Sequence, residues 1–238
     1  MLLLVSVADA REARAAARGG ADIVDAKDPR RGALGAVTAR ALAAIRAAVP
    51  DRPLSVALGD ASDEGAVERR VRRAAAHGCA YVKVGFRGAV SMARARPLAR
   101  AALCPAGGEM PVVLVAYADW ERADSLAPAA LVDLAAAEGA SAVLLDTALK
   151  DAPLFALMAP RAVGEWVDRA HAAGLTVALA GSLVARDFRR AAAVQADIVG
   201  VRGAACAGGR IGRVERARVA ALSVAARRAS ALRAAALV

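Results

Sequence analysis

The chain has 238 residues and a net charge of +10, and 58% of its residues are apolar although only 3% are aromatic. This length suits one sizeable domain, and a core built from Val, Leu, Ile and Ala favours helices packed on a sheet. The positive charge is spread over the predicted helices. Its densest run, at residues 69–73, has no interleaved aromatic residue to stack on bases, so we expect no nucleic-acid partner.

Eight short apolar runs predict eight strands along the chain. They are continuous rather than alternating, which is typical of strands that are covered on both faces. Between them lie Ala-, Arg- and Leu-rich segments of helical length at residues 9–18, 38–48, 63–77, 128–138 and 160–173. The predicted strands are residues 2–7, 22–27, 54–58, 81–85, 112–117, 142–146, 176–180 and 197–201.

The strand-then-helix alternation predicts an α/β protein with a single (β/α)8 TIM barrel spanning residues 1–238. Several predicted helices end at a glycine just before the next strand, as helix caps often do. The alternative is a doubly wound open sheet, but no Gly-x-Gly-x-x-Gly motif follows the first strand.

Lysine is rare in this chain: three lysines, Lys27, Lys83 and Lys150, stand against thirty arginines. Arginine holds a surface charge equally well but cannot lose its proton near neutral pH, so a Schiff base or a proton transfer requires lysine. Each lysine lies at or just beyond the end of a predicted strand. Chance retention is the alternative for any one of them, but their common position favours a chemical role.

The predicted carboxyl ends of the strands carry acids beside these lysines. In a TIM barrel the active site lies at this end. Asp25 and Lys27 are two residues apart and therefore point the same way from their strand. An ionisable residue on an apolar strand is costly unless it is paired or functional. The predicted catalytic group is Asp25, Lys27, Lys83, Asp146 and Lys150, with Asp119 as a further candidate.

Structural roles remain open for the acids. Asp25 could be a buried partner that holds Lys27, and Asp146 could cap the loop after the sixth strand. For Asp60 and Asp119 we favour the interpretation that they stabilise a loop or cap a helix.

The loops after the seventh and eighth predicted strands are rich in small residues, which let backbone N–H groups approach an anion. TIM barrels often bind phosphate there. Ser182 and Arg202 could add side-chain donors. The predicted phosphate-binding residues are Gly181, Ser182, Arg202, Gly203 and Ala204.

The only histidines, His77 and His171, lie near helix ends on the side opposite the predicted site. This placement argues against a histidine base or a histidine-bound metal. We therefore expect no metal and no cofactor, and a lysine imine would supply the electron sink.

Three scattered cysteines without metal-type spacing indicate a reducing compartment. The N-terminus lacks a basic leader, and no apolar stretch is long enough to span a bilayer. We expect a cytoplasmic homo-oligomer without a membrane partner.

Seven segments carry a resemblance that runs in order through nearly the whole chain. They include LLVS at 3–6, GGADIVDAKDP at 19–29 followed by GALGA, YVKVG at 81–85 and YAD at 117–119. LDTALKD at 145–151, ALAGSL at 178–183 and DIVGVRGAAC at 197–206 complete the set. These segments resemble the (5-formylfuran-3-yl)methyl phosphate synthases, also called 4-(hydroxymethyl)-2-furancarboxaldehyde-phosphate synthases, of methanofuran biosynthesis.

This resemblance implies a TIM-barrel lyase that condenses two molecules of glyceraldehyde 3-phosphate into a furan aldehyde phosphate, with loss of water and one phosphate. It also implies that Lys27 forms the Schiff base, that Lys83 accepts a proton, and that Asp25, Asp146 and Lys150 complete the site. The stretch after Cys206 is shorter here than in archaeal members. The Ala- and Arg-rich composition suggests a bacterium, where the product would enter methylofuran for one-carbon oxidation.

Two rival functions remain. One is another lysine-dependent aldolase that acts reversibly on a phosphosugar and releases no inorganic phosphate. The other is a non-catalytic barrel that binds a phosphorylated metabolite, in which Lys27 could become arginine without loss.

Overall fold

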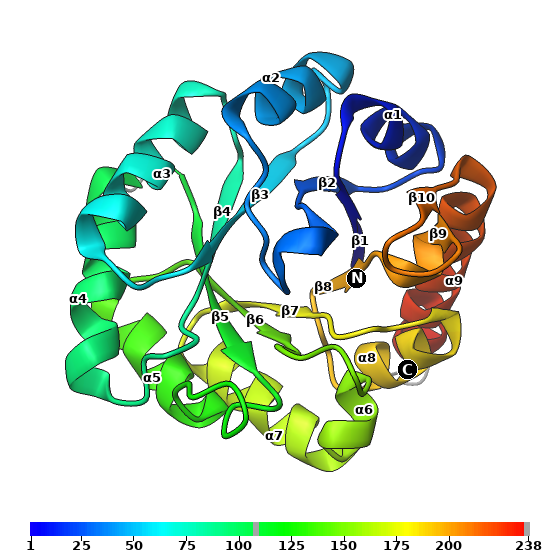
Figure 1. Cartoon of the computed structure of the whole chain (residues 1–238). Helices are drawn as coiled ribbons and strands as arrows, with labels where there is room; N and C mark the ends of the chain where they lie inside the picture. The colour runs from blue at the N-terminus through cyan, green and yellow to red at the C-terminus, as the bar shows by residue number, and fades with distance from the viewer. Residues whose placement is uncertain (107–109, 236–238) are drawn as a thin grey trace.

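Eight parallel strands close into a barrel in chain order, so the predicted TIM barrel is confirmed and the open sheet is excluded. The computed structural model describes residues 1–106 and 110–235. Figure 1 shows the strands surrounded by a ring of helices. The strands are β1 (Leu2–Val7), β2 (Ile23–Ala26), β3 (Leu54–Asp60), β4 (Tyr81–Gly85), β5 (Val112–Tyr117), β6 (Ala142–Asp146), β7 (Thr176–Leu179) and β8 (Ile198–Val201).

Helices cover the outside of the barrel and connect successive strands. They are α1 (Ala10–Arg18), α2 (Ala39–Ala48), α3 (Glu64–Ala76), α4 (Met92–Leu103), α5 (Pro128–Glu138), α6 (Leu154–Leu157), α7 (Pro160–Ala172), α8 (Phe188–Ala193) and α9 (Arg216–Ala235). Four short 3-10 turns accompany them: η1 (Pro29–Arg31), η2 (Cys104–Ala106), η3 (Ala185–Asp187) and η4 (Gly203–Ala205). After η4, β9 (Cys206–Ala207) and β10 (Arg213–Val214) form a small antiparallel hairpin.

The predicted elements differ from the observed ones mainly at their ends. Asp9, Thr38 and Asp63, predicted as first helical residues, are N-caps whose side chains accept a backbone N–H of the first turn. Strand β3 runs on to Asp60, two residues beyond the prediction. Lys27 lies just after β2, although its backbone N–H still donates to the Val7 carbonyl at 2.9 Å.

The main core lies between the strands and the helices. Val, Leu and Ala side chains fill it, with Phe86 and Phe188 among the few fully buried aromatic side chains. Trp166 is also buried and donates its indole N–H to the Pro128 carbonyl at 2.9 Å. A second cluster inside the barrel includes Leu34 and Tyr117. Leu34 comes from the loop after β2, so that loop is anchored within the barrel.

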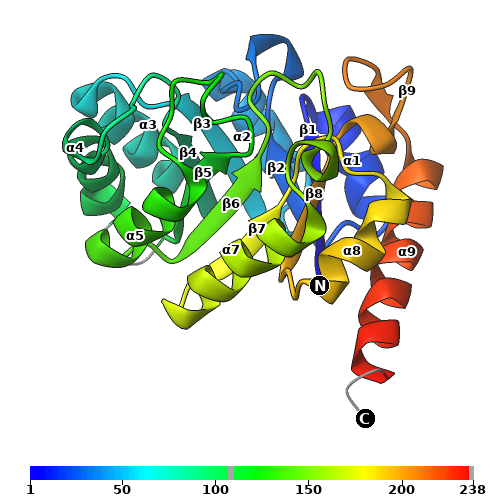
Figure 2. The same cartoon turned by 90° about the horizontal axis from the view of Figure 1, so that it is seen from below.

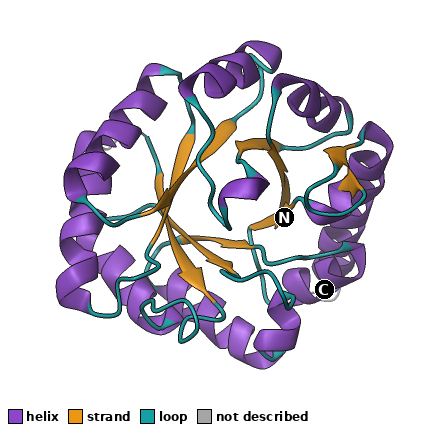
Figure 3. Ribbon diagram, in the orientation of Figure 1, coloured by secondary structure: helices purple, strands orange, loops and turns teal. Residues whose placement is uncertain are grey.

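The two ends of the barrel differ in what covers them. The N-terminus lies at one end, whereas the β9 hairpin lies at the other, the rim at which the strands have their carboxyl ends (Figure 2). Figure 3 shows the short turn η1 inside the ring of helices. Among the helices of the described residues, none combines the length and the apolar character needed to cross a membrane.

Candidate active site

Two lysine–carboxylate pairs lie at the rim, and the first is formed by strand residues. Lys83 Nζ on β4 lies 2.7 Å from Asp25 Oδ1 on β2, and both side chains are buried. Strand β3 separates them, but the β3 residues in register with them are the small Ser55 and Ala57, which leave the space open. The direct partner of Asp25 is thus Lys83, not Lys27 as the structural alternative proposed.

The charge of Asp25 is stabilised from several sides. Ser6 Oγ donates to Asp25 Oδ2 at 2.8 Å. Burial alone would raise the pKa of Asp25, but the charges of Lys83 and Lys27 outweigh it and hold this pKa below its ordinary value. Asp25 is therefore an ionised carboxylate at neutral pH.

The second pair joins the end of β6 to the loop that follows it. Lys150 Nζ contacts Asp146 Oδ1, and the Thr147 backbone N–H donates to the same oxygen at 2.8 Å. Burial would raise the pKa of Asp146, but Lys150 and Lys27 lower it below its ordinary value. The Lys150 side chain is 13% exposed, against 5% for Lys83. Asp146 thus both caps its loop and pairs with a lysine.

Lys150 has a left-handed backbone conformation, with φ of 64°, which is uncommon for a residue with a side chain. Asp119 supports this geometry. Its two carboxylate oxygens accept the backbone N–H groups of Ala148 and Leu149 at 2.7 and 2.9 Å. Asp119 is therefore placed to shape the loop that presents Lys150, as its favoured capping role predicts, and its contacts here are all to backbone.

Lys27 lies between the two pairs and is 8% exposed. Its side chain makes no ion pair or hydrogen bond within the part of the chain that the structure describes. The pKa of Lys27 is lowered from 10.5 to about 7, chiefly by burial. The charges of Lys150 and Lys83 also lower this pKa, whereas those of Asp146 and Asp25 raise it. A large fraction of Lys27 is therefore a neutral amine at neutral pH, the form that attacks a carbonyl carbon.

The lysines face a cavity of about 560 Å³ that opens at the rim and continues along the inside of the barrel. Its inner wall combines apolar side chains of β1, β2, β5 and β6 with small residues. Ser55, Ala142, Ala178 and Gly200 belong to this wall. Around the rim it is lined by Lys27, Lys83, Asp146, Lys150, Gly181, Ser182, Arg202, Gly203, Ala204 and Arg210.

The predicted phosphate loops both border this cavity. Gly181 and Ser182 have φ of 95° and 55°, and a Cβ on Gly181 would lie 2.9 Å from Thr147 Cγ2. Gly181 is therefore required for chain packing. A Cβ added to Gly203 would fit, since the nearest atom to it would be the Arg210 backbone nitrogen at 3.6 Å. In the described residues, the backbone N–H groups of Ser182, Gly203 and Ala204 have no protein acceptor, which leaves them available to an anion.

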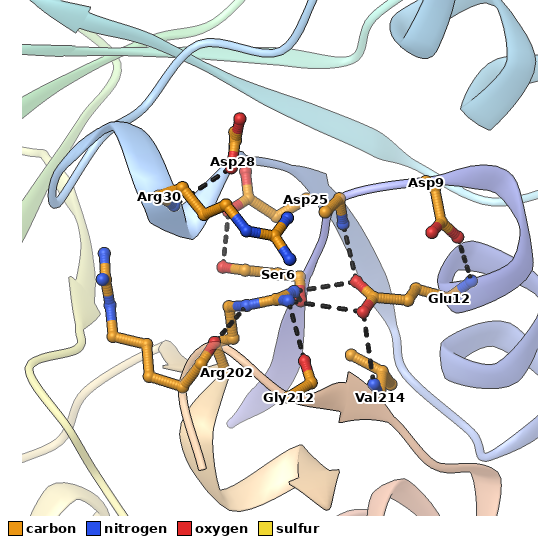
Figure 4. Close-up of polar contacts among 11 residues, drawn as sticks. Ser6, Asp9, Glu12, Asp25, Asp28, Arg30, Arg202, Gly212 and Val214 are labelled. Carbon is orange, nitrogen blue, oxygen red and sulfur yellow. Dashed lines mark hydrogen bonds and ion pairs between the residues drawn. The ribbon is translucent and has the colours of Figure 1, made fainter. Parts of the chain in front are cut away.

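Arg202 has a different role from the predicted one. Its side chain is 7% exposed, and its five N–H groups donate to Glu12 (twice), Ser6, Arg210 and Gly212. Figure 4 shows the guanidinium between Glu12 and Gly212. The prediction that Arg202 donates to phosphate is not supported by these contacts. Its donors instead fasten the hairpin after β8 to the start of the barrel.

Polar groups suited to a metal ion are not gathered in this structure. In residues 1–106 and 110–235, no group of three or more His, Cys, Asp or Glu side chains is placed to hold one. His171 contacts Asp197 at 2.9 Å, and Asp197 immediately precedes β8, so this histidine lies at the end opposite the rim.

Comparisons with known proteins show the family to which the chain belongs. The model of the 4-HFC-P synthase family matches residues 3–223. The chain belongs to the 4-HFC-P synthase family. The (5-formylfuran-3-yl)methyl phosphate synthase of Methanopyrus kandleri is 42% identical over 210 residues, which cover 86% of this chain and 89% of that protein. The one from Methanocaldococcus jannaschii is 38% identical over 224 residues, covering 91% and 95%.

Solved structures extend the comparison to the fold. A crystal structure of 3-hexulose-6-phosphate synthase aligns with a TM-score of 0.69 at 18% identity, covering 96% of this chain and 99% of that one. This likeness shows the barrel fold alone.

Sequence reasoning placed Tyr117 at the rim as a packing residue, and it missed two further residues near the rim. Tyr117 is fully buried, and its hydroxyl donates to Asp60 Oδ1 at 2.5 Å. Burial and the Asp60 charge raise the pKa of Tyr117 well above its ordinary value. Glu12 and Arg210 were missed, because one lies on a helix and the other in a Gly-rich loop. Residues 203–212 contain no acidic residue that could pair with Arg210, and this was the sign in the sequence that Arg210 is available to an anion.

Proposed function

We propose that this chain is a (5-formylfuran-3-yl)methyl phosphate synthase, a lyase of methanofuran- or methylofuran-type cofactor biosynthesis. It condenses two molecules of glyceraldehyde 3-phosphate through a lysine Schiff base, with loss of water and one phosphate. The observation that carries the proposal is Lys27, a buried amine with a pKa of about 7 set between two lysine–carboxylate pairs. Membership of the family supports the same activity.

The residues support a sequence of proton transfers around Lys27. Its neutral amine attacks the carbonyl carbon of one triose phosphate and releases water as the imine forms. The protonated imine acidifies the adjacent carbon, and the Lys83–Asp25 pair takes up that proton: Lys83 passes its own proton to Asp25 and then accepts the proton from carbon. The enamine then attacks the second aldehyde. Asp146 and Lys150, on the other side of Lys27, would move protons during the elimination of phosphate and the dehydration that yields the furan. Water then hydrolyses the product imine, which releases the furan aldehyde and regenerates the Lys27 amine.

Each substrate molecule brings a phosphate, so two phosphate sites are needed. We propose that backbone N–H groups of Gly181, Ser182, Gly203 and Ala204 bind one of them. Gly203→Val should raise KM strongly while the fold survives, because this position has room for a Cβ. An unchanged KM would remove these loops from the phosphate site. Lys150 and an arginine are the candidates for the second site.

The test of the activity uses the protein with glyceraldehyde 3-phosphate alone. We expect furan absorbance to appear together with inorganic phosphate. Borohydride added with substrate should attach a reduced triose to the peptide that contains Lys27. Lys83→Arg is the matched control, since it should still form the adduct at Lys27. An aldolase would release no phosphate, and a non-catalytic barrel would give neither adduct nor furan.

Three further properties complete the proposal: one domain over residues 1–238, a cytoplasmic location and a homo-oligomeric assembly. Gel filtration with light scattering tests the assembly, and a mass of 24.1 kDa would contradict it. A single cooperative unfolding transition would support the single domain.

A further inference from the structure

The cations around the cavity differ in how they are neutralised. Five cationic side chains line it: Lys27, Lys83, Lys150, Arg202 and Arg210. Three of them contact a carboxylate directly, namely Lys83, Lys150 and Arg202. Lys27 is the amine that must be neutral to react. Arg210 is thus the remaining cation, and within the described residues it forms no ion pair.

Arg210 is held in place by neutral partners only. Its two terminal nitrogens donate to the carbonyls of Pro29 and Gly32, each at 2.7 Å. Its own backbone carbonyl accepts the Arg202 Nε–H at 2.8 Å. A guanidinium has five N–H groups, so these two bonds leave three without a protein acceptor in the described part of the chain.

The electrostatic setting of Arg210 favours an anion. Burial lowers the pKa of Arg210, the charge of Arg202 lowers it further, and Asp146 opposes both without contacting it. A half-buried guanidinium that contacts carbonyls but no carboxylate in the described residues gains from a doubly charged ligand, because Asp146 and Asp28 act on its charge only from a distance. Arg210 lines the cavity, so a ligand bound there lies within reach of its side chain.

We propose that Arg210 binds the phosphate group of a substrate molecule at Lys27 and is the arginine of the second phosphate site. This inference rests on the proposed function and names one residue of its substrate site. Arg210 also ties the hairpin after β8 to the loop that begins directly after Lys27, through Pro29 and Gly32. Phosphate bound there would therefore be fixed relative to the reacting amine.

The main experiment compares two aldehydes that differ only in phosphate. Borohydride trapping at Lys27 is measured over a range of glyceraldehyde 3-phosphate and of unphosphorylated glyceraldehyde. Arg210→Ala should raise the half-saturating concentration of the phosphorylated aldehyde by about 10- to 100-fold, as the loss of a charged hydrogen bond does. Glyceraldehyde should be trapped as before. Arg210→Lys keeps the charge but not the planar set of donors. Its half-saturating concentration of the phosphorylated aldehyde should lie between those of the wild type and of Arg210→Ala.

The matched control is Arg213→Ala in the adjacent strand β10, where the side chain is exposed and forms no hydrogen bond or ion pair within the described residues. Trapping of both aldehydes should be unaffected. Equal weakening of both aldehydes in Arg210→Ala would overturn the proposal and leave Arg210 as a tie between loops. Unchanged trapping would overturn it as well.

A second measurement separates this inference from the proposed function. Calorimetric titration with inorganic phosphate does not depend on an imine. The loop site should bind phosphate in both proteins, so the comparison concerns the second binding event. We expect this event to be at least about tenfold tighter in the wild type than in Arg210→Ala, and equal affinities for it would overturn the inference. If no adduct forms at Lys27 but the difference in phosphate affinity is still observed, the proposed function is rejected and the role of Arg210 in phosphate binding stands. If Arg210→Ala fails to fold, Arg210→Lys gives the same comparison.

Discussion

The two lysine–carboxylate pairs are built in different ways. Asp25 and Lys83 come from strands β2 and β4, and the side chains are 0% and 5% exposed. Asp146 and Lys150 join a strand to a loop, and the lysine is more exposed and sits on left-handed backbone. The first pair is therefore fixed by the barrel itself, whereas the second depends on how its loop is held. Fixed and adjustable charges thus flank the same reactive amine.

The largest expected effect comes from Lys27, the residue that lies between the two pairs. Lys27→Met removes the amine without adding a charge and should abolish turnover, beyond the roughly 10²–10⁴-fold typical of a single proton-transfer group. Lys27→Arg should be equally inactive but less stable, because it adds a permanent charge where burial already lowers the lysine pKa. Turnover and thermal midpoint measure both effects. Retained activity in either variant would end the Schiff-base assignment.

The second prediction compares the stability of the pairs. Asp25→Asn leaves Lys83 buried without a counter-charge and should lower the free energy of unfolding by about 3–5 kcal/mol. Asp146→Asn should cost less, because the Lys150 side chain can turn toward water. Urea unfolding of both variants and of the wild type measures the two losses of unfolding free energy. Equal losses would mean that the loop pair is as rigid as the strand pair.

The third prediction concerns the support of the loop pair. Asp119→Ala removes the acceptor of two backbone N–H groups and should lower the free energy of unfolding by about 1–3 kcal/mol. It should also lower kcat more than it raises KM, because Lys150 loses its position. Asp151→Ala is the control, since this exposed acid forms a surface ion pair with Arg122. A stability loss with kcat unchanged would separate Asp119 from the chemistry.

The smallest effect is a shift in pH dependence. Only the neutral amine reacts, so imine trapping at Lys27 should rise through pH about 7 and then level off. Asp146 and Asp25 both raise this pKa, and Asp146 has the larger influence. Asp146→Asn should therefore move the midpoint to lower pH by more than Asp25→Asn does. The reverse order would contradict the placement of Lys27.

The same titration acts on stability. The folded pKa of Lys27 is depressed, so between pH about 7 and 10.5 the unfolded state binds more protons. The unfavourable contribution of Lys27 is full below pH 7 and fades as the pH rises to 10.5. The stability difference between Lys27→Met and the wild type should shrink over this window.

The strands and lysines were predictable from the sequence because continuous apolar runs and helix-ending glycines mark each unit. The sequence did not show which lysine pairs with which carboxylate. Lys83 reaches Asp25 across β3 only because the barrel is closed and the intervening residues are small. Neither the left-handed Lys150 nor the hairpin that carries Arg210 follows any hydrophobic period, so their positions required the structure.

The cavity along the inside of the barrel separates two properties of the molecule. Its deeper wall is formed by residues two or four positions before the charged ones on the same strands, such as Ile23 before Lys27, Tyr81 before Lys83 and Ala142 before Asp146. The apolar depth of the cavity and its charged rim are thus contributed by different positions along the same βα units, so the shape of the interior and the acid–base groups lie in separate sets of side chains.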